Sequence, residues 1–149
     1  MHSAPITKLR KCFQKYAGEE GLTTARTLAQ SCMHRQPLLD LIQRYDARFP
    51  EETETVTRFR EFVEENPECF ERELEIGHIT GAAWLIDAAG EQVLLTHHRK
   101  LDIWIQLGGH ADGDPDTLNV AMREAEEESG LDQIIPIDRE IFDLDIHPI

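Results

Sequence analysis

The stretch "GHADGDPDTLNVAMREAEEESGL", residues 109–131, predicts an acidic helix that begins after an aspartate–proline pair and ends at a glycine. Asp114 suits an N-cap and Pro115 the first helical position, while Gly130 suits the residue that follows a helix. We therefore expect a helix over residues 115–129. The residues of its apolar stripe, which would pack on a sheet, are Leu118, Ala121, Met122 and Ala125.

Four glutamates crowd the end of this helix, where the backbone dipole is already negative. At about 100° per residue, Glu124, Glu127 and Glu128 share one arc, and Glu126 points to the other flank. Carboxylates at this spacing repel each other by about 0.2–0.5 kcal/mol per pair, and a divalent cation would turn the repulsion into attraction. Grouped oxygen ligands suit Mg²⁺ or Mn²⁺. A solvated acidic helix face is the alternative interpretation.

A glycine pair before the helix favours the metal interpretation. Gly108 and Gly109 follow a candidate strand, residues 102–107, and glycine lets the backbone approach a ligand or metal closely. A plain tight turn is the alternative for the glycines alone. Together with the arginine and glutamates of the helix, they resemble the signature of the Nudix hydrolases, G-x5-E-x7-R-E-U-x-E-E-x-G-U, in which U is aliphatic. The matching positions are Gly109, Arg123, Glu124, Ala125, Glu127, Glu128, Gly130 and Leu131.

Two positions depart from the family's pattern. Pro115 stands where the signature has a glutamate, and Asp114 or Asp116 would replace that carboxylate only in part. Leu107 stands before the glycines, where proline is usual in the family. Trp104, by contrast, resembles the tryptophan that commonly precedes the family's glycine pair.

The resemblance covers residues 76–149 and implies an α/β fold, namely an α/β/α sandwich with a mixed sheet. We divide the chain into a helical N-terminal extension, residues 1–72, and a Nudix domain, residues 73–149. The family's later strands and its C-terminal helix have no counterpart in this sequence. The domain is therefore expected to be incomplete at its C-terminus.

By this resemblance, the chain would be a hydrolase that cleaves the pyrophosphate bond of a nucleoside diphosphate linked to another moiety. Its cofactor would be Mg²⁺ or Mn²⁺, and its arginine would orient a glutamate. The residues implied are Glu124, Glu127 and Glu128 for the metal, Glu127, Glu128 and Arg123 for catalysis, and Gly108, Gly109 and His110 for substrate binding. The glutamate that acts as base is left open, and a loop hydrogen bond is the alternative role for His110. A non-catalytic Nudix-like module that binds a nucleotide or a partner is the alternative function.

The N-terminal half predicts only helices. Apolar periodicity and prolines suited to first helical positions indicate four of them, over residues 5–16, 24–33, 37–49 and 50–67. The part they play in function is not indicated by any motif.

Short apolar runs indicate strands in the second half. Residues 78–87 and 92–98 predict a β-hairpin, and the alternation over residues 139–149 predicts a half-buried strand. Trp84 and Trp104 are expected in the core. His97 and His98 are neighbours on a strand, so their side chains should point to opposite faces and not share a site.

Composition limits the partners. Residues 1–50 carry eight Lys and Arg against four Asp and Glu, whereas residues 51–149 carry seven against 25. Such an acidic body would repel a nucleic-acid backbone, so we expect a small nucleotide derivative as the partner and no nucleic acid.

Cys12, Cys32 and Cys69 form no CxxC pair and suggest reduced thiols of a cytoplasmic protein. No apolar run approaches the ~20 residues that span a bilayer, so no membrane partner is expected. A homodimer is expected by resemblance alone.

Overall fold

The computed structural model describes residues 19–100 and 102–148, with the backbone alone for residues 19–32. The chain divides into two compact units, one up to His34 and one from Arg35 onward. The helix expected over residues 5–16 lies outside the described residues.

Helix α2 (Glu19–Arg48) is a single helix, and our expectation of two helices separated before Pro37 was wrong. Proline removes one backbone donor but does not forbid the helix from continuing. The helix continues because the next turns bury Leu38, Ile42 and Tyr45, each at most 2% exposed. Burial of such side chains contributes about 1.5–3 kcal/mol each, which offsets the cost of roughly 3 kcal/mol for an interior proline.

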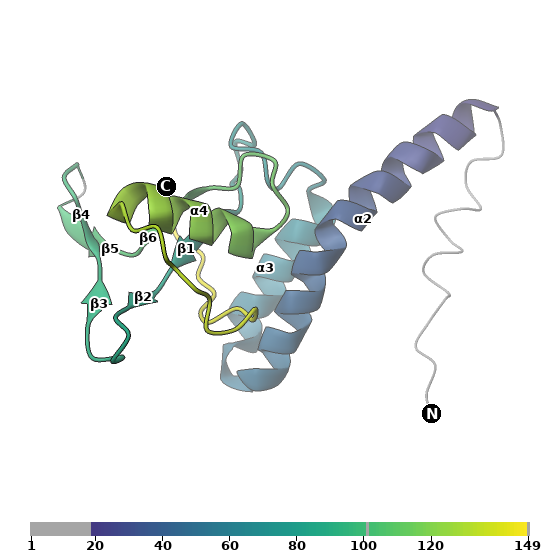
Figure 1. The fold of residues 1–149 in the computed structure, drawn as a ribbon. Helices are drawn as coiled ribbons and strands as arrows, with labels where there is room; N and C mark the ends of the chain where they lie inside the picture. The colour runs from purple at the N-terminus through teal and green to yellow at the C-terminus, as the bar shows by residue number, and fades with distance from the viewer. Residues whose placement is uncertain (1–18, 101, 149) are drawn as a thin grey trace. The chain divides into compact units, whose positions relative to one another are not determined.

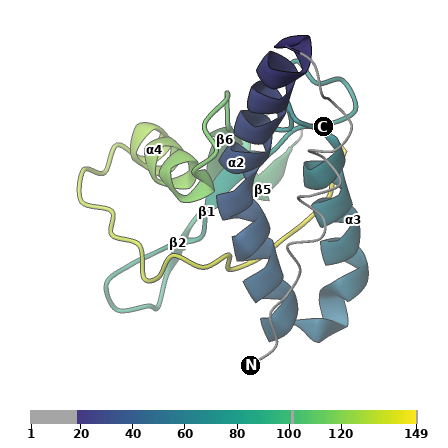
Figure 2. The ribbon, with the colours of Figure 1, turned by 90° about the vertical axis from the view of Figure 1, so that its right-hand side faces the viewer.

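The helix expected over residues 50–67 is confirmed, with a different first turn. A short 3₁₀ helix, η1 (Pro50–Glu52), leads directly into α3 (Thr53–Glu65). Val56 and Val63 are fully buried on the face of α3 that meets α2. In Figures 1 and 2 the second half of α2 and α3 lie side by side.

Within the described residues, six short strands form three two-stranded antiparallel ladders. The pairs are β1 (Thr80–Ala83) with β6 (Leu107–His110), β2 (Leu85–Ile86) with β3 (Val93–Leu94), and β4 (Thr96–His98) with β5 (Ile103–Ile105). The predicted hairpin is confirmed in β2 and β3, where the Asp87 carboxylate accepts hydrogen bonds from the N–H groups of Glu91 and Gln92. The glycine pair lies inside β6 and does not follow the end of a strand, as we had expected.

The mixed sheet that we expected is absent from the described residues. Successive strands β2 to β6 are joined by short turns, and a parallel pair needs a crossover of a dozen or more residues. Helix α4 (Thr117–Ser129) has that length, but no strand follows it within residues 130–148. The strand predicted over residues 139–149 is therefore wrong: without a ladder partner, the alternating segment buries Leu144 and leaves Phe142 exposed.

Helix α4 packs on β1 and β6 (Figure 1). Its start was predicted two residues too early, because the N-cap is Asp116, whose carboxylate accepts a hydrogen bond from Asn119 N at 3.1 Å. Its end was predicted correctly, since Gly130 adopts the left-handed conformation with φ of 70°. Val120 and Ala125 are its fully buried side chains.

One hydrophobic core joins the two halves of the compact unit 35–149. Its buried members come from α2, α3 and α4 and from the segments between and after them: Leu38, Ile42, Tyr45, Val56, Val63, Cys69, Phe70, Ile79, Ala111, Val120 and Leu144. Residues 35–72 thus share their packing with the expected Nudix domain, and the division at residue 72 stays a prediction drawn from the family's pattern.

The two tryptophans are not core residues, contrary to our expectation. Trp84 is 47% and Trp104 is 68% exposed. Both lie on or next to the hairpin strands β2 to β5, whereas the strands that α4 packs on are β1 and β6 (Figure 1). Each indole ring contacts another aromatic ring instead. Trp84 stacks on Phe142 with ring centroids 6.3 Å apart, and Trp104 lies against His97 with ring centroids 5.0 Å apart.

Of the helices in the described part of the chain, none combines the length and apolar character needed to span a membrane.

Candidate metal and phosphate site

The glycine pair of β6 lies against the acidic end of α4. Gly109 faces the helix, and a Cβ built on it would lie only 2.6 Å from the Glu124 carboxyl carbon. The Gly108 N–H donates a hydrogen bond to Glu128 Oε2 at 3.2 Å. The two halves of the predicted motif, with fourteen residues of chain between Gly109 and Glu124, are therefore in direct contact.

Arg123 bridges the helix and the strand. Its guanidinium donates to Glu124 Oε1 at 2.9 Å and to the backbone carbonyl of His110 at 3.1 Å. The hydrogen bond to Glu124 is the first cause of the raised pKa of Arg123, so the charge on the guanidinium is secured by its neighbour. This geometry supports the predicted orienting role, because Glu124 cannot turn away from β6 without losing the pairing.

The carboxylate groups of the three glutamates in the expected metal site do not form one cluster. Glu124 is half-buried between Arg123 and Gly109, whereas Glu127 and Glu128 are exposed. Among the described residues, no three His, Cys, Asp or Glu side chains form a group that could hold a metal ion. Mutual repulsion separates like charges at this spacing, and two of the three carboxylates hold a hydrogen bond to β6 or Arg123. Their role as ligands stays a prediction.

The His110 imidazole pairs with a residue that the sequence did not single out. His78 Nε2 lies 2.8 Å from His110 Nδ1, with ring centroids 4.8 Å apart. Alternation along β6 directs His110 to the face opposite Gly109, away from the Glu124 carboxylate. Burial, followed by the nearby charge of His110, lowers the pKa of His78. The imidazole pair depends on the register between the segment before β1 and the end of β6, which no local sequence signal specifies.

A second missed residue, Arg72, anchors the loop between β6 and α4. Its guanidinium makes a two-pronged ion pair with the Asp112 carboxylate. Asp112 has a φ of 51°, uncommon for a residue with a side chain, and the next residue, Gly113, donates its N–H to the Phe70 carbonyl at 3.0 Å. The hydrogen bond from Arg72 holds the pKa of Asp112 below its usual value. The segment after α3 thus fixes the approach to the acidic helix.

The aspartates considered as substitutes for the missing glutamate are engaged in capping the helix. Asp114 accepts from Asp116 N at 2.9 Å and from the Asn119 side chain at 2.7 Å. These contacts, with Asn119 first, lower the pKa of Asp114. Pro115, at the glutamate position itself, lines a separate cavity between α2 and α4. Leu107, the other departure from the pattern, is buried.

Comparison with protein-family models, with curated proteins and with solved structures gives no match for this chain. The resemblance to the Nudix hydrolases therefore rests on the residues of the motif and on their arrangement.

Proposed function

We propose that the chain is a Nudix-type, metal-dependent hydrolase that cleaves the pyrophosphate bond of a nucleoside diphosphate linked to another moiety. The observation that carries the proposal is the contact between the glycine pair of β6 and the glutamates of α4. Gly109 leaves room for the Glu124 carboxylate, and Gly108 donates to Glu128. A merely solvated acidic helix face would have no need of either contact.

The donor set fits a hard divalent cation. Glu124, Glu127 and Glu128 supply carboxylate oxygens from one flank of α4, the ligand type that Mg²⁺ and Mn²⁺ prefer. When bound, such an ion would neutralise phosphate oxygens and lower the pKa of the attacking water. The glutamates would be its ligands, and an Arg123 that holds Glu124 against β6 would orient the first of them.

Other groups of the chain would position the substrate and accept a proton from water. The β6 backbone at Gly109, free of a side chain, would let a metal ion or a metal-bound phosphate at Glu124 lie close to the strand. Glu127 is exposed and, within the described part of the chain, makes no hydrogen bond of the kind that engages Glu124 and Glu128, so it is the carboxylate most available to accept a proton from water. His110 would act from the opposite face of the ladder, and its role in substrate binding is the least supported of the predicted ones.

The test is hydrolysis of a substrate panel by the full chain with and without Mg²⁺ or Mn²⁺. The panel contains nucleoside diphosphate sugars, dinucleotide polyphosphates, NADH and oxidised nucleotides, and product nucleotides are separated by chromatography. We expect turnover of at least one member, lost in Glu127→Gln and in Glu128→Gln. Glu126→Gln is the matched control, because Glu126 lies on the same helix but on the other flank, and it should retain activity.

Equal activity in all three variants would contradict the proposed site. No turnover by the native chain, with the circular dichroism spectrum of a folded protein and with Mg²⁺ bound at these glutamates, would favour the non-catalytic binding module.

A further inference from the structure

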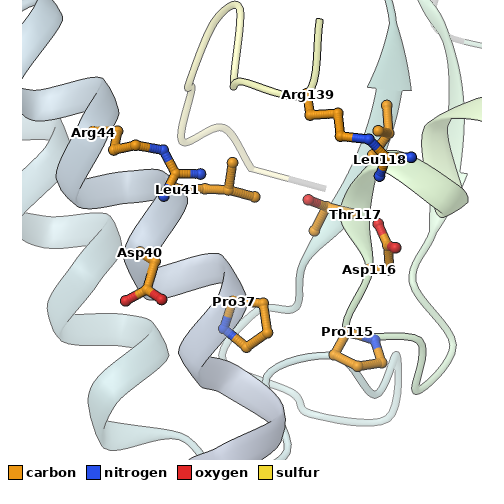
Figure 3. Close-up of a pocket in the computed structure, with 9 residues that line it drawn as sticks. All are labelled: Pro37, Asp40, Leu41, Arg44, Pro115, Asp116, Thr117, Leu118 and Arg139. Carbon is orange, nitrogen blue, oxygen red and sulfur yellow. The ribbon is translucent and has the colours of Figure 1, made fainter.

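A cavity of about 360 Å³ lies between α2 and the beginning of α4, apart from the glutamates (Figure 3). Three segments of the compact unit 35–149 line it, through Pro37, Asp40, Leu41, Arg44, Pro115, Asp116, Thr117, Leu118 and Arg139. Glu124 lies seven positions after Thr117, which corresponds to roughly 10 Å along a helix. The cavity is within the size range of small-molecule sites.

Apolar groups form two facing walls of this cavity. Pro37 and Leu41 come from α2, and Pro115 and Leu118 come from the start of α4 and the residues before it (Figure 3). Each wall contains a proline, whose pyrrolidine ring is rigid. A flat apolar ligand group could therefore pack between the two rings without the entropy cost of ordering a flexible side chain.

Most of the charged groups around the cavity already have partners. Arg44 makes an ion pair with Glu140 at 2.8 Å. Asp40 accepts a hydrogen bond from Gln36 at 2.8 Å, and Asp116 caps α4. The Arg139 side chain, in contrast, makes no hydrogen bond or ion pair within the described residues. Its planar guanidinium therefore brings unused donors to the cavity.

We propose that this cavity binds a small organic monocarboxylate with an apolar body. The apolar part would lie between the two walls, and the carboxylate would accept hydrogen bonds from Arg139, for which its two oxygens are geometrically matched. A single negative charge is favoured over two, because Asp40 and Asp116 on the same cavity would repel a dianion. This site is independent of the glutamates and of the proposed hydrolysis.

The experiment uses the full chain labelled with ¹⁵N and follows amide resonances while benzoate is added. Benzoate is expected to shift the resonances of cavity residues such as Leu41, Thr117 and Leu118. Three other probes separate the contributions: acetate has the carboxylate without the body, benzamide has the body without the charge, and phenyl phosphate has the same body with a dianion. Each of the three should bind more weakly than benzoate.

Two variants test the role assigned to the arginine. Arg139→Gln should weaken benzoate binding about tenfold, the size expected for losing a charge-assisted hydrogen bond at a partly exposed site. Arg139 is exposed, so the substitution should leave the fold intact. Arg58→Gln is the control, since Arg58 is an exposed arginine of α3 outside the cavity, and it should bind benzoate as the native chain does.

Four results would overturn the proposal. They are an absence of shifts at cavity residues, equal binding of acetate, tighter binding of phenyl phosphate, and benzoate binding that Arg139→Gln leaves unchanged. The first would mean that the cavity is only a packing defect, the second that any anion suffices, and the third that the site prefers phosphate. The fourth would mean that the ligand does not use Arg139.

Discussion

Gly81 and Gly109 face each other across the β1–β6 ladder, and both face α4. A Cβ on Gly81 would meet the Thr117 carbonyl oxygen and the Val120 side chain, both at 2.9 Å. The three heavy atoms nearest to a Cβ on Gly109 would all belong to the end of the Glu124 side chain. The first position thus keeps the helix backbone close to the sheet, and the second keeps a carboxylate in place.

Alanine at these two positions should therefore separate stability from function. Gly81→Ala should lower the free energy of unfolding by about 1–3 kcal/mol, since the helix backbone must move to relieve the contact. Gly109→Ala should cost less, because Glu124 can swing away, but it should reduce metal-dependent activity at least as much as Glu124→Gln does. Urea unfolding and hydrolysis assays measure the two effects. Equal losses of stability in both variants would contradict the distinction.

Cys69 offers a second test at the scale of one residue. Its side chain is fully buried, and burial raises the pKa of its thiol to about 11 from the usual 9.0. Because the thiolate is the reactive form, we expect slow alkylation of Cys69 in the folded chain at pH 8 and rapid alkylation in urea. Peptide mass spectrometry follows this site in a Cys12→Ser, Cys32→Ser background, which removes the other two thiols.

The same shift has a defined sign for stability. The folded chain holds the proton more tightly than the unfolded chain, so the contribution of Cys69 to stability is complete below pH 9 and is lost as the pH rises from 9 to about 11. Cys69→Ala should show a smaller loss of stability over that range. Alkylation of folded Cys69 as fast as in urea would show that the thiol is not protected.

At the scale of elements, α4 carries an unfavourable charge arrangement that its packing compensates. Three carboxylates at i, i+3 and i+4 oppose each other and the helix dipole. Without divalent ions, Glu127→Gln should therefore raise the free energy of unfolding by about 0.5–1 kcal/mol. With Mg²⁺ the native chain should instead be more stable than Glu127→Gln, because ion binding stabilises only the chain that retains all three glutamates.

Thermal unfolding with EDTA and with Mg²⁺ checks this reversal. Glu126→Gln is again the control: it removes one charge from the same helix but no member of the predicted ligand set, so Mg²⁺ should stabilise it as it does the native chain. A Glu127→Gln variant that gains as much from Mg²⁺ as the native chain would remove Glu127 from the metal site.

The sequence predicts individual helices better than long-range packing and strand pairing. Apolar periodicity identified α3 and α4, because helix formation depends on local patterning. The end of α4 was identified from Gly130, because glycine readily adopts the left-handed conformation that follows a helix. It failed at Pro37, where long-range burial of Leu38 and Ile42 outweighs a local helix breaker. It also failed for residues 139–149, since alternation alone does not provide a strand to pair with.

The candidate site shows the same division. The glutamates of α4 and the glycines of β6 were identified from spacing within one short stretch. His78 and Arg72 were missed because they lie 32 and 40 residues from their partners, His110 and Asp112, and depend on the register of β1 with β6. The exposure of the tryptophans likewise depends on which strands a helix covers.

At the scale of the whole molecule, charge and packing oppose each other. The compact unit 35–149, which contains the core, carries ten Lys and Arg against 27 Asp and Glu, a net charge of −17, so self-repulsion favours unfolding at low ionic strength. NaCl should therefore raise the unfolding midpoint as the screening length falls to about 8 Å near 0.15 M and about 3 Å near 1 M. This part of the effect should be the same for any monovalent salt and should not depend on particular glutamates.

MgCl₂ at matched ionic strength separates general screening from a specific site. If α4 binds the ion, the native chain should unfold at a higher temperature in MgCl₂ than in NaCl, and a Glu127→Gln, Glu128→Gln double variant should lose that difference while keeping its response to NaCl. If the two salts act alike on both proteins, the glutamates respond only as part of the overall charge. The acidic end of α4 would then be a solvated face, and its contact with the β6 glycines would be packing without metal chemistry.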